Sequence, residues 1–448
     1  MVARSAGGRE VAGSNPVTPM ISSGKDWTEA KSFCSVCFSI KKGACGKMEE
    51  KIIFHVDVNN AFLSWESVYR MKVEGETRDL REIASAIGGE KAKRHGIILA
   101  KSIEAKKYGV KTGEPIVDAL RKCPQLLIVP PRHAIYGEYS KKFMGILSNY
   151  SPDVEQFSVD EAFVDMTGTK KLFGEPVEVA ERMKKEIYDT LGFTVNIGIS
   201  NNKLLAKMAS DFEKPYKVHT LFPEEIQEKM WPLSVRELFF VGKSGEKKLN
   251  DLGIYTIGQL AQTDKEILQS VMKKQGETIW NFANGKAVSF VEHNRESNKG
   301  YGNSTTLSVD VCDKSTAQMV LLSLAENIGR RLRKDGVKIE MVSVGLRFFD
   351  MTNASHQCVL DHPTNITDEI HQVACELLEE FWDGTPVRLI GIQTGRVTEG
   401  EGSRQLSLFD TTDYDKLQRL DKAMDSIRER FGSGAVKRAS LSEDKKLL

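Results

Sequence analysis

Residues 156–165, QFSVDEAFVD, hold the acidic pair Asp160 and Glu161 between two short apolar half-strands. Far earlier in the chain, residues 51–58, KIIFHVDV, form another apolar run that closes on an acid, Asp57. If the two segments are neighbouring strands of one sheet, three carboxylates meet at one edge. Carboxylates this close repel one another unless cations lie between them. Because such oxygen ligands suit Mg²⁺ and paired Mg²⁺ ions suit phosphoryl transfer, the pattern predicts a two-metal site.

The segments around these acids follow a regular order, once an inserted region rich in Lys and Gly is set aside. Helical spacing follows strand 51–58, and then come a hairpin at 154–166, an amphipathic helix at 175–191 and a strand at 194–199. This βαββαβ order is typical of a split-βαβ arrangement, in which the first strand and the hairpin can be central neighbours. We therefore expect an α+β multidomain protein with a ferredoxin-like sheet at its centre.

A helical segment is expected at 216–285, and it contains the sequence VGKSG with Gly242, Lys243 and Gly245. A turn of this kind between short helices presents backbone N–H groups to a phosphate, as in a helix-hairpin-helix motif. Taken alone, the same residues are equally compatible with an ordinary connection between two helices.

Residues 304–397 repeat the βαββαβ order without repeating the sequence, which predicts a second α+β domain. The expected strands are 305–311, 338–349, 356–361 and 387–397, and the expected helices are 315–334 and 366–382. Because residues 299–398 carry ten basic and thirteen acidic side chains, DNA contact there requires a local cluster that includes Arg331 and Arg333. The alternative for that cluster is a solvated helix end favoured by the helix dipole.

The composition describes a globular protein of several domains. A chain of 448 residues is too long for one compact core, and 28% charged with 40% apolar residues is an ordinary balance. A net charge of +1 argues mildly against a protein that passively coats nucleic acid. No apolar run reaches about 18 residues, so no membrane span is expected. Seven scattered cysteines favour a reducing, cytoplasmic location over a disulfide framework.

The first 47 residues differ from the rest. Residues 13–16, GSNP, are the translation of DNA that resembles the T-arm of a transfer RNA gene. We expect 1–47 to be a disordered or non-native extension, with the natural start at Met48. Cys34, Cys37 and Cys45 could supply three zinc ligands, but the sequence offers no second CxxC and no nearby histidine to complete a site.

The tail 399–448 contains a short apolar motif at 405–410, QLSLFD. Large apolar residues in a polar stretch have no core of their own and are suited to a pocket on a partner. Beyond them, one helical stripe is expected to pack on the protein itself; it comprises Leu417, Leu420, Met424, Ile427 and Phe431.

Three ordered motifs carry a resemblance to a known family: residues 54–57, FHVD, with Phe62; residues 158–163, SVDEAF; and residues 198–207, GISNNKLLAK. With them, the chain resembles Y-family translesion DNA polymerases of the bacterial DNA polymerase IV group over about 50–397. The resemblance implies a palm (48–63 and 125–215), fingers (64–124), a thumb (216–285), a linker (286–300), a little finger (301–398) and a flexible tail (399–448) with a clamp-binding peptide.

The resemblance also implies an activity: low-fidelity, template-directed addition of dNTPs to a primer 3′-OH. Asp57 and Asp160 would bridge two Mg²⁺ ions, Glu161 and the carbonyl of Val58 would complete the metal sites, and Phe62 would be the steric gate against a 2′-OH. The other implied contacts are Ser102, Lys106 and Lys203 for the nucleotide, Gly242, Lys243, Gly245, Arg331 and Arg333 for DNA, and Gln405, Leu406, Leu408 and Phe409 for the sliding clamp. The expected partners are primed DNA, dNTPs and the clamp, with no membrane and a monomeric protein.

Two residues depart from the family pattern. Family members usually have Tyr and Arg at Ile103 and Lys106. Ile103 cannot hydrogen-bond a phosphate, and Lys106 lacks the bidentate fork of a guanidinium. We therefore expect weaker nucleotide binding with retained activity, with Lys101 or Ser102 as residues that could compensate.

Two alternatives come from other classes. A non-catalytic, clamp-tethered scaffold of a mutagenesis complex would usually lack the metal carboxylates, which this chain keeps. A nucleotidyl cyclase would share the palm-like layout, but it would need neither a helix-hairpin-helix, nor a second α+β domain, nor a clamp peptide.

Overall fold

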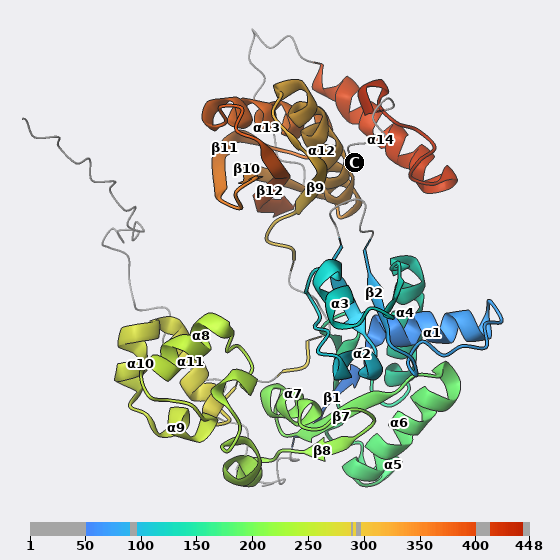
Figure 1. Ribbon diagram of the computed structural model, residues 1–448, viewed down its shortest axis with the longest axis vertical. Helices are drawn as coiled ribbons and strands as arrows, with labels where there is room; N and C mark the ends of the chain where they lie inside the picture. The colour runs from blue at the N-terminus through green and yellow to red at the C-terminus, as the bar shows by residue number, and fades with distance from the viewer. Residues whose placement is uncertain (1–50, 90–95, 288–289, 293–296, 400–412, 442–448) are drawn as a thin grey trace, which may run out of the picture. The chain divides into compact units, whose positions relative to one another are not determined.

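The computed structural model describes residues 51–89, 96–287, 290–292, 297–399 and 413–441 (Figure 1). The expectations for residues 1–47 and for the peptide 405–410 therefore lie outside the described residues. No helix within the described ranges combines the length and apolarity that a membrane crossing needs.

A five-stranded sheet forms the first α+β unit, in the order β5-β6-β1-β7-β8. Its strands are β1 (Ile53–Val58), β5 (Val154–Gln156), β6 (Glu161–Asp165), β7 (Val195–Ser200) and β8 (Val218–Thr220). The order of the first four is that of a split-βαβ fold. The predicted α+β class is confirmed, and β1 lies between β6 and β7 as the carboxylate pattern required.

Side-chain alternation along β1 divides the two faces of this sheet. Phe54, Val56 and Val58 enter the main core, which the helices α1 (Ala61–Lys72), α4 (His133–Ser148) and α6 (Pro176–Leu191) share. His55 points to the opposite face, where its Nδ1 lies 2.7 Å from the Ser210 hydroxyl of α7 (Lys203–Asp211). Because successive strand residues alternate, Asp57 belongs to this α7 face.

Gly198 of β7 lets α7 approach the sheet closely. A Cβ added at Gly198 would lie 1.9 Å from the carbonyl oxygen of Ala206 and 2.4 Å from the amide nitrogen of Ser210. Any side chain here would push the helix away. The glycine therefore helps to set the distance between the sheet and the helix that follows it.

A smaller three-stranded sheet, in the order β3-β2-β4, packs beside α1. Its elements are β2 (Ser85–Gly88), β3 (Ile98–Lys101), α2 (Ile103–Lys107), α3 (Ile116–Lys122) and β4 (Leu127–Val129). Leu63 of α1 shares a small core with Leu80, Ile87 and Val129. This shared core holds the corner between β3 and α2 next to the corner between β1 and α1.

The chain between β8 and β9 is mainly helical and has its own core. Its helices are α8 (Lys243–Asp251), α9 (Ile257–Gln262), α10 (Lys265–Met272) and α11 (Lys274–Ala283), preceded by short turns at Pro223–Glu225, Ile226–Met230 and Val235–Glu237. The single-turn helix α5 (Lys170–Phe173) belongs to the first unit, before α6.

The second α+β unit has the predicted order of elements along the chain. The order of strands in its sheet differs from that of the first unit. Its elements are β9 (Gly302–Val311), α12 (Lys314–Lys334), β10 (Val337–Phe348), β11 (Asn353–Thr364), α13 (Thr367–Phe381) and β12 (Val387–Glu399). The strands pair in the order β11-β10-β12-β9, all antiparallel. The helices α12 and α13 pack against each other and against the sheet (Figure 1).

The C-terminal helix α14 (Tyr414–Phe431) joins this unit in a way that its apolar stripe does not predict. Met424 is buried, but Leu420, Ile427 and Phe431 are 46%, 40% and 71% exposed. The contact depends instead on ion pairs, with Arg428 on Glu326 of α12 and Arg438 on Glu326 and Asp368. Arg438 lies just before a short turn at Ala439–Leu441.

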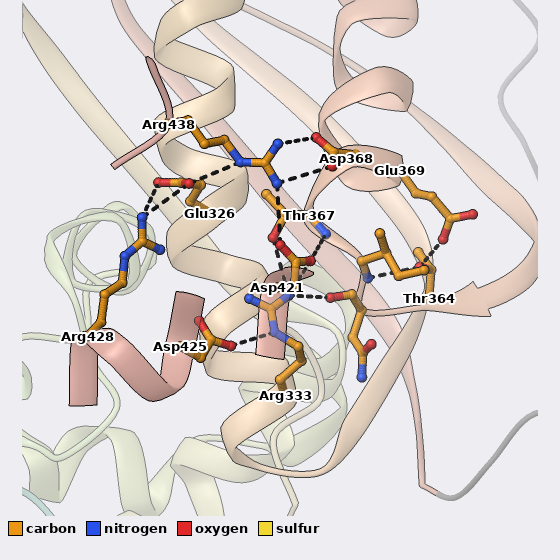
Figure 2. Close-up of polar contacts among 12 residues, drawn as sticks. Glu326, Arg333, Thr364, Thr367, Asp368, Glu369, Asp421, Asp425, Arg428 and Arg438 are labelled. Carbon is orange, nitrogen blue, oxygen red and sulfur yellow. Dashed lines mark hydrogen bonds and ion pairs between the residues drawn. The ribbon is translucent and has the colours of Figure 1, made fainter. Parts of the chain in front are cut away.

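Asp421 is the buried centre of this cluster (Figure 2). Its carboxylate accepts a hydrogen bond at 2.8 Å from the backbone N–H of Thr367, the first residue of α13. It also pairs with Arg333 at 2.9 Å and with Arg438 at 3.3 Å. A residue of α14 thus caps the N-terminus of α13, where a negative charge is favoured.

Arg333 belongs to this cluster and not to an exposed basic patch. Its side chain is 8% exposed, and its guanidinium pairs with Asp421 and Asp425 and donates to the carbonyl of Asn365 at 2.8 Å. The expectation that Arg333 contacts DNA is therefore withdrawn, because its charge is committed to holding α14. Arg331 is exposed and donates to the Gly302 carbonyl.

Replacing Arg333 by Met should loosen α13 and α14 together. The change leaves Asp421 and Asp425 without a main cationic partner, which should cost about 3 kcal/mol of local stability. Hydrogen exchange of the amides in 367–381 and 414–431 of the full chain measures this. The exposed Lys334, one residue away, provides the control Lys334→Met; equal exchange in both variants would contradict the role assigned to the cluster.

Candidate functional site

The three acids come together through strand pairing. Asp57, near the end of β1, is directly opposite Glu161, the first residue of β6. One residue further, the backbone N–H of Val58 donates to the carbonyl of Asp160 at 3.0 Å. Since cross-strand partners share a face of the sheet, Asp57 and Glu161 lie on the same side. The hairpin turn thus brings Asp160 beside the end of β1, as the sequence pattern required.

Each of the two paired acids has its own cation. Lys214, which follows α7, forms ion pairs with Asp57 and Asp211. Burial raises the pKa of Asp57 to about 6 against the pull of Lys214, and the charges of Glu161 and Asp211 add to the rise. A carboxylate in this position strongly favours a neighbouring positive charge.

Glu161 is held differently. Its carboxylate lies 2.8 Å from the ammonium of Lys207 and 3.6 Å from the imidazole of His55. Burial opposes ionisation of Glu161, but His55 and Lys207 together lower its pKa to about 2. Burial also lowers the pKa of His55, which favours its neutral form.

Asp160 is oriented by its own turn. The hydroxyl of Ser158 donates to the Asp160 carboxylate at 2.5 Å and accepts from the Asp160 backbone N–H at 3.2 Å. Asp57 and Glu161 are therefore cross-strand neighbours, Asp160 precedes Glu161 in the chain, and each of the three carboxylates has separate partners. Over the described ranges, no three acidic, imidazole or thiol groups are already gathered around one point.

A cavity of about 400 Å³ opens beside these acids. Its walls come from the β1–α1 corner, the β3–α2 corner, the tip of the hairpin and the segment after α7. The lining residues are Asp57, Val58, Asn59, Asn60, Ala61, Phe62, Leu99, Ala100, Lys101, Ser102, Ile103, Lys106, Thr112, Asp160, Lys214 and Pro215. Two acids, three lysines and one aromatic ring thus face a single space large enough for a small, charged ligand.

Phe62 forms a firm apolar wall of the cavity. Its ring stacks on Tyr136 of α4, with centroids 4.8 Å apart and planes at 19°. Tyr136 is itself fixed, because its hydroxyl donates at 3.1 Å to Glu66, and Arg132 pairs with the same carboxylate. The turn into α1 is made by Asn60 in the left-handed region at φ 48°, a conformation that asparagine tolerates.

The structure places the expected nucleotide contacts unequally. Lys106 and Ser102 line the cavity, but the Ser102 hydroxyl caps α2 by accepting from the Ala105 N–H at 3.0 Å. Ile103 is 48% exposed and also lines the cavity. Lys203 does not line it; its ammonium lies 2.7 Å and 2.8 Å from the two carboxylate oxygens of Glu155.

Lys214 is the lysine that sequence reasoning missed. It lines the cavity and contacts Asp57, whereas the expected Lys203 faces Glu155. Both lie near the ends of α7, and no spacing rule reveals which of them the chain turns toward the acids. The position of Lys214 depends on how the segment after α7 folds back beside β1.

The expected DNA contacts in the helical segment lie at the start of α8. Gly242 is the N-cap residue and Lys243 the first residue of the helix, and both are exposed. Gly245 is buried, within reach of Val241 and Met272. Two of the three positions are therefore accessible for a phosphate at this helix start.

The donor set at the acids fits a hard divalent cation. Asp57 and Asp160 line one cavity, Glu161 is the cross-strand neighbour of Asp57, and all three provide oxygen ligands. Burial has raised the pKa of Asp57, so its ionised form needs a cation, a need that Lys214 meets here. Oxygen ligands in small number are what Mg²⁺ takes when its remaining ligands come from water and phosphate.

Comparison with known proteins gives matches along most of the described chain. Residues 56–211 match the impB/mucB/samB family, and residues 298–408 match the C-terminal domain of the impB/mucB/samB family. Residues 223–254 match the IMS family HHH motif.

Named relatives extend these matches to nearly full length. The DNA polymerase IV of Clostridium acetobutylicum is 44% identical over 393 residues, which cover 88% of this chain and 98% of that protein. The DNA polymerase IV of Acetivibrio thermocellus is 37% identical over 402 residues, covering 89% and 99%. Among solved structures, a Y-family DNA polymerase chimera aligns with a TM-score of 0.66 at 25% identity, covering 78% of this chain and 100% of that one.

Proposed function

The chain belongs to the impB/mucB/samB family of Y-family DNA polymerases, and from this premise we infer that it is a DNA-directed DNA polymerase that acts in translesion synthesis. Such polymerases bind a DNA template and depend on divalent metal ions. The observation that carries the proposal within this chain is the cavity, where Asp57 and Asp160 face Phe62 and three lysines.

We propose that Asp57, Asp160, Glu161 and the Val58 carbonyl hold two Mg²⁺ ions. When bound, the ions would lower the pKa of the primer 3′-OH and neutralise the leaving pyrophosphate. Strand pairing holds Asp57 and Glu161 opposite each other, and Ser158 orients Asp160. These contacts keep the ligands in place before any substrate enters, so that little reorganisation is needed.

The lysines of the cavity are suited to the triphosphate. An ammonium is a point-charge partner for phosphate oxygens. Lys214 lies in the cavity and can exchange Asp57 for a phosphate once the carboxylate has another cation. We therefore propose Lys214 as a triphosphate contact in place of Lys203.

Phe62 is proposed as the steric gate. Its stacking on Tyr136 prevents the ring from yielding to a 2′-OH, so a deoxyribose would be preferred. The ring lines the same cavity as the acids, and this supports the proposal that it lies against the sugar of a nucleotide whose phosphates reach the lysines.

The remaining partners are proposals from position and sequence. The exposed Gly242 and Lys243 at the start of α8 could receive a DNA phosphate, with Gly245 beneath them, and Arg331 remains an exposed cation at the end of α12. The clamp peptide, with Gln405, Leu406, Leu408 and Phe409, lies outside the described residues and is supported by its sequence alone. Low fidelity, a monomeric state and a cytoplasmic location stay predictions.

Removing the carboxylate of Asp160 tests the catalytic proposal. Asp160→Ala should reduce primer extension with Mg²⁺ and dNTPs to background, because a carboxylate that would hold Mg²⁺ is lost. Asp189→Ala removes an equal charge from the exposed face of α6 and should extend like the wild type. Wild-type rates in Asp160→Ala would contradict the assignment, whereas a wild type unable to extend any primer would favour the scaffold alternative.

Changing the aromatic ring tests the gate. Phe62→Ala should raise incorporation of ribonucleotides relative to deoxyribonucleotides by about tenfold or more, because the wall beneath the sugar is removed. Phe62→Tyr keeps the flat ring and should keep the discrimination. Unchanged selectivity in a Phe62→Ala protein that still extends primers with dNTPs would show that the ring is part of the core only.

A pair of lysine variants decides between the two candidates for the phosphate. Lys214→Met should raise the KM for dNTP about tenfold, since one charged contact is lost. Lys203→Met should leave KM near the wild-type value, because Lys203 faces Glu155. A larger rise in KM for Lys203→Met than for Lys214→Met, in single-nucleotide incorporation assays, would assign the triphosphate contact to Lys203.

A further inference from the structure

Lys101 is fixed at the edge of the cavity by the backbone on both sides. It is the last residue of β3, opposite Ala86 of β2. The next residue, Ser102, donates its N–H to the Ser85 carbonyl at 2.9 Å and accepts from the Ser85 N–H at 3.1 Å. The half-buried Lys101 side chain lines the cavity.

The partner of Lys101 is neutral. Its ammonium donates to the Thr112 hydroxyl at 3.2 Å. Three other lysines near the site have carboxylates: Lys214 has Asp57, Lys207 has Glu161 and Lys203 has Glu155. Among the residues that the structure describes, no carboxylate forms an ion pair with Lys101, and the acid whose charge reaches it, Glu114, is paired with Lys122.

Lys101 also has a like charge for a neighbour. Lys106, one turn into α2, lines the same cavity and is exposed. Burial lowers the pKa of Lys101 and the charge of Lys106 lowers it further, against a smaller opposing effect of the Glu114 carboxylate. Two ammonium groups on one wall, one of them partly desolvated, make a site that an anion would stabilise.

Ile103 leaves the cavity without one hydrogen-bond donor that a phosphate could use. Ile103, which lies between Lys101 and Lys106 in the sequence, lines the cavity and has no side-chain donor. The same lining includes Phe62 and two of the acids, so a nucleotide with its sugar on the ring would have its phosphates within the space that the lysines also line. The cavity therefore offers a phosphate three point charges and no guanidinium.

We propose that Lys101 is a nucleotide-positioning residue that binds the triphosphate of the incoming nucleotide together with Lys106 and Lys214, and so supplies the contact that Ile103 cannot make. This inference rests on the proposed polymerase function. It identifies a cationic group that comes from the end of β3 and not from α2.

The test compares Lys101→Met with Lys101→Arg and with the control Lys107→Met. Lys107 is 64% exposed, pairs with Glu104 and does not line the cavity. Single-nucleotide incorporation gives kcat and KM for dNTP, and inorganic tripolyphosphate serves as a competitive probe that has neither sugar nor base. Thermal unfolding of each variant is measured alongside.

Lys101→Met should raise the KM for dNTP and the inhibition constant of tripolyphosphate by about tenfold each, with a much smaller change in kcat. Lys101→Arg should restore most of both values, and Lys107→Met should match the wild type. Wild-type constants in Lys101→Met would overturn the proposal. So would equal losses in the Met and Arg variants accompanied by a lower unfolding temperature, since that result marks a structural role.

The outcome is separable from failure of the proposed function. If the wild-type protein does not extend a primer, the polymerase assignment fails before any variant is compared. If the wild type extends primers and tripolyphosphate inhibits it equally in Lys101→Met, only the role of Lys101 is refuted.

Discussion

The pairing of β1 with β6 is the constraint on which the rest of the site depends. It sets Asp57 opposite Glu161 and brings Asp160 to the end of β1. Buried acids this close favour neighbouring cations, and the chain supplies them as Lys214 and Lys207. The positive charges around the acids are thus part of what makes the sheet edge stable.

Helix α7 connects the packing of the sheet to the charges of the site. Its close approach requires Gly198, where any Cβ would meet the carbonyl of Ala206. From this position the helix directs Lys207 to Glu161, and the segment that follows it directs Lys214 to Asp57. One glycine therefore helps to determine where two of the site's cations lie, although it contacts neither acid.

In the second α+β unit, ion pairs and not apolar packing hold the C-terminal helix. The helix α14 keeps most of its apolar stripe exposed and is held by arginine–carboxylate pairs around Asp421, which also caps α13. Buried ion pairs add little net stability compared with apolar packing, but loss of one partner is costly. Such a contact is specific in geometry. It uses Arg333, which lies in a basic stretch of the sequence and was therefore expected on the surface.

Local patterns in the sequence were enough to predict the helices and strands and the meeting of the acidic strand ends, because periodicity and strand ends are local properties. They indicated the βαββαβ order twice, the hairpin with Asp160 and Glu161, and the central position of β1. The pairing of each charged side chain with its partner became visible only in the folded chain. Lys203 and Lys214 lie near the two ends of one helix, yet one faces Glu155 and the other Asp57, and Arg333 turns inward because α14 brings Asp421 to it. Those choices depend on contacts between residues far apart in the chain, which no local pattern of side chains records.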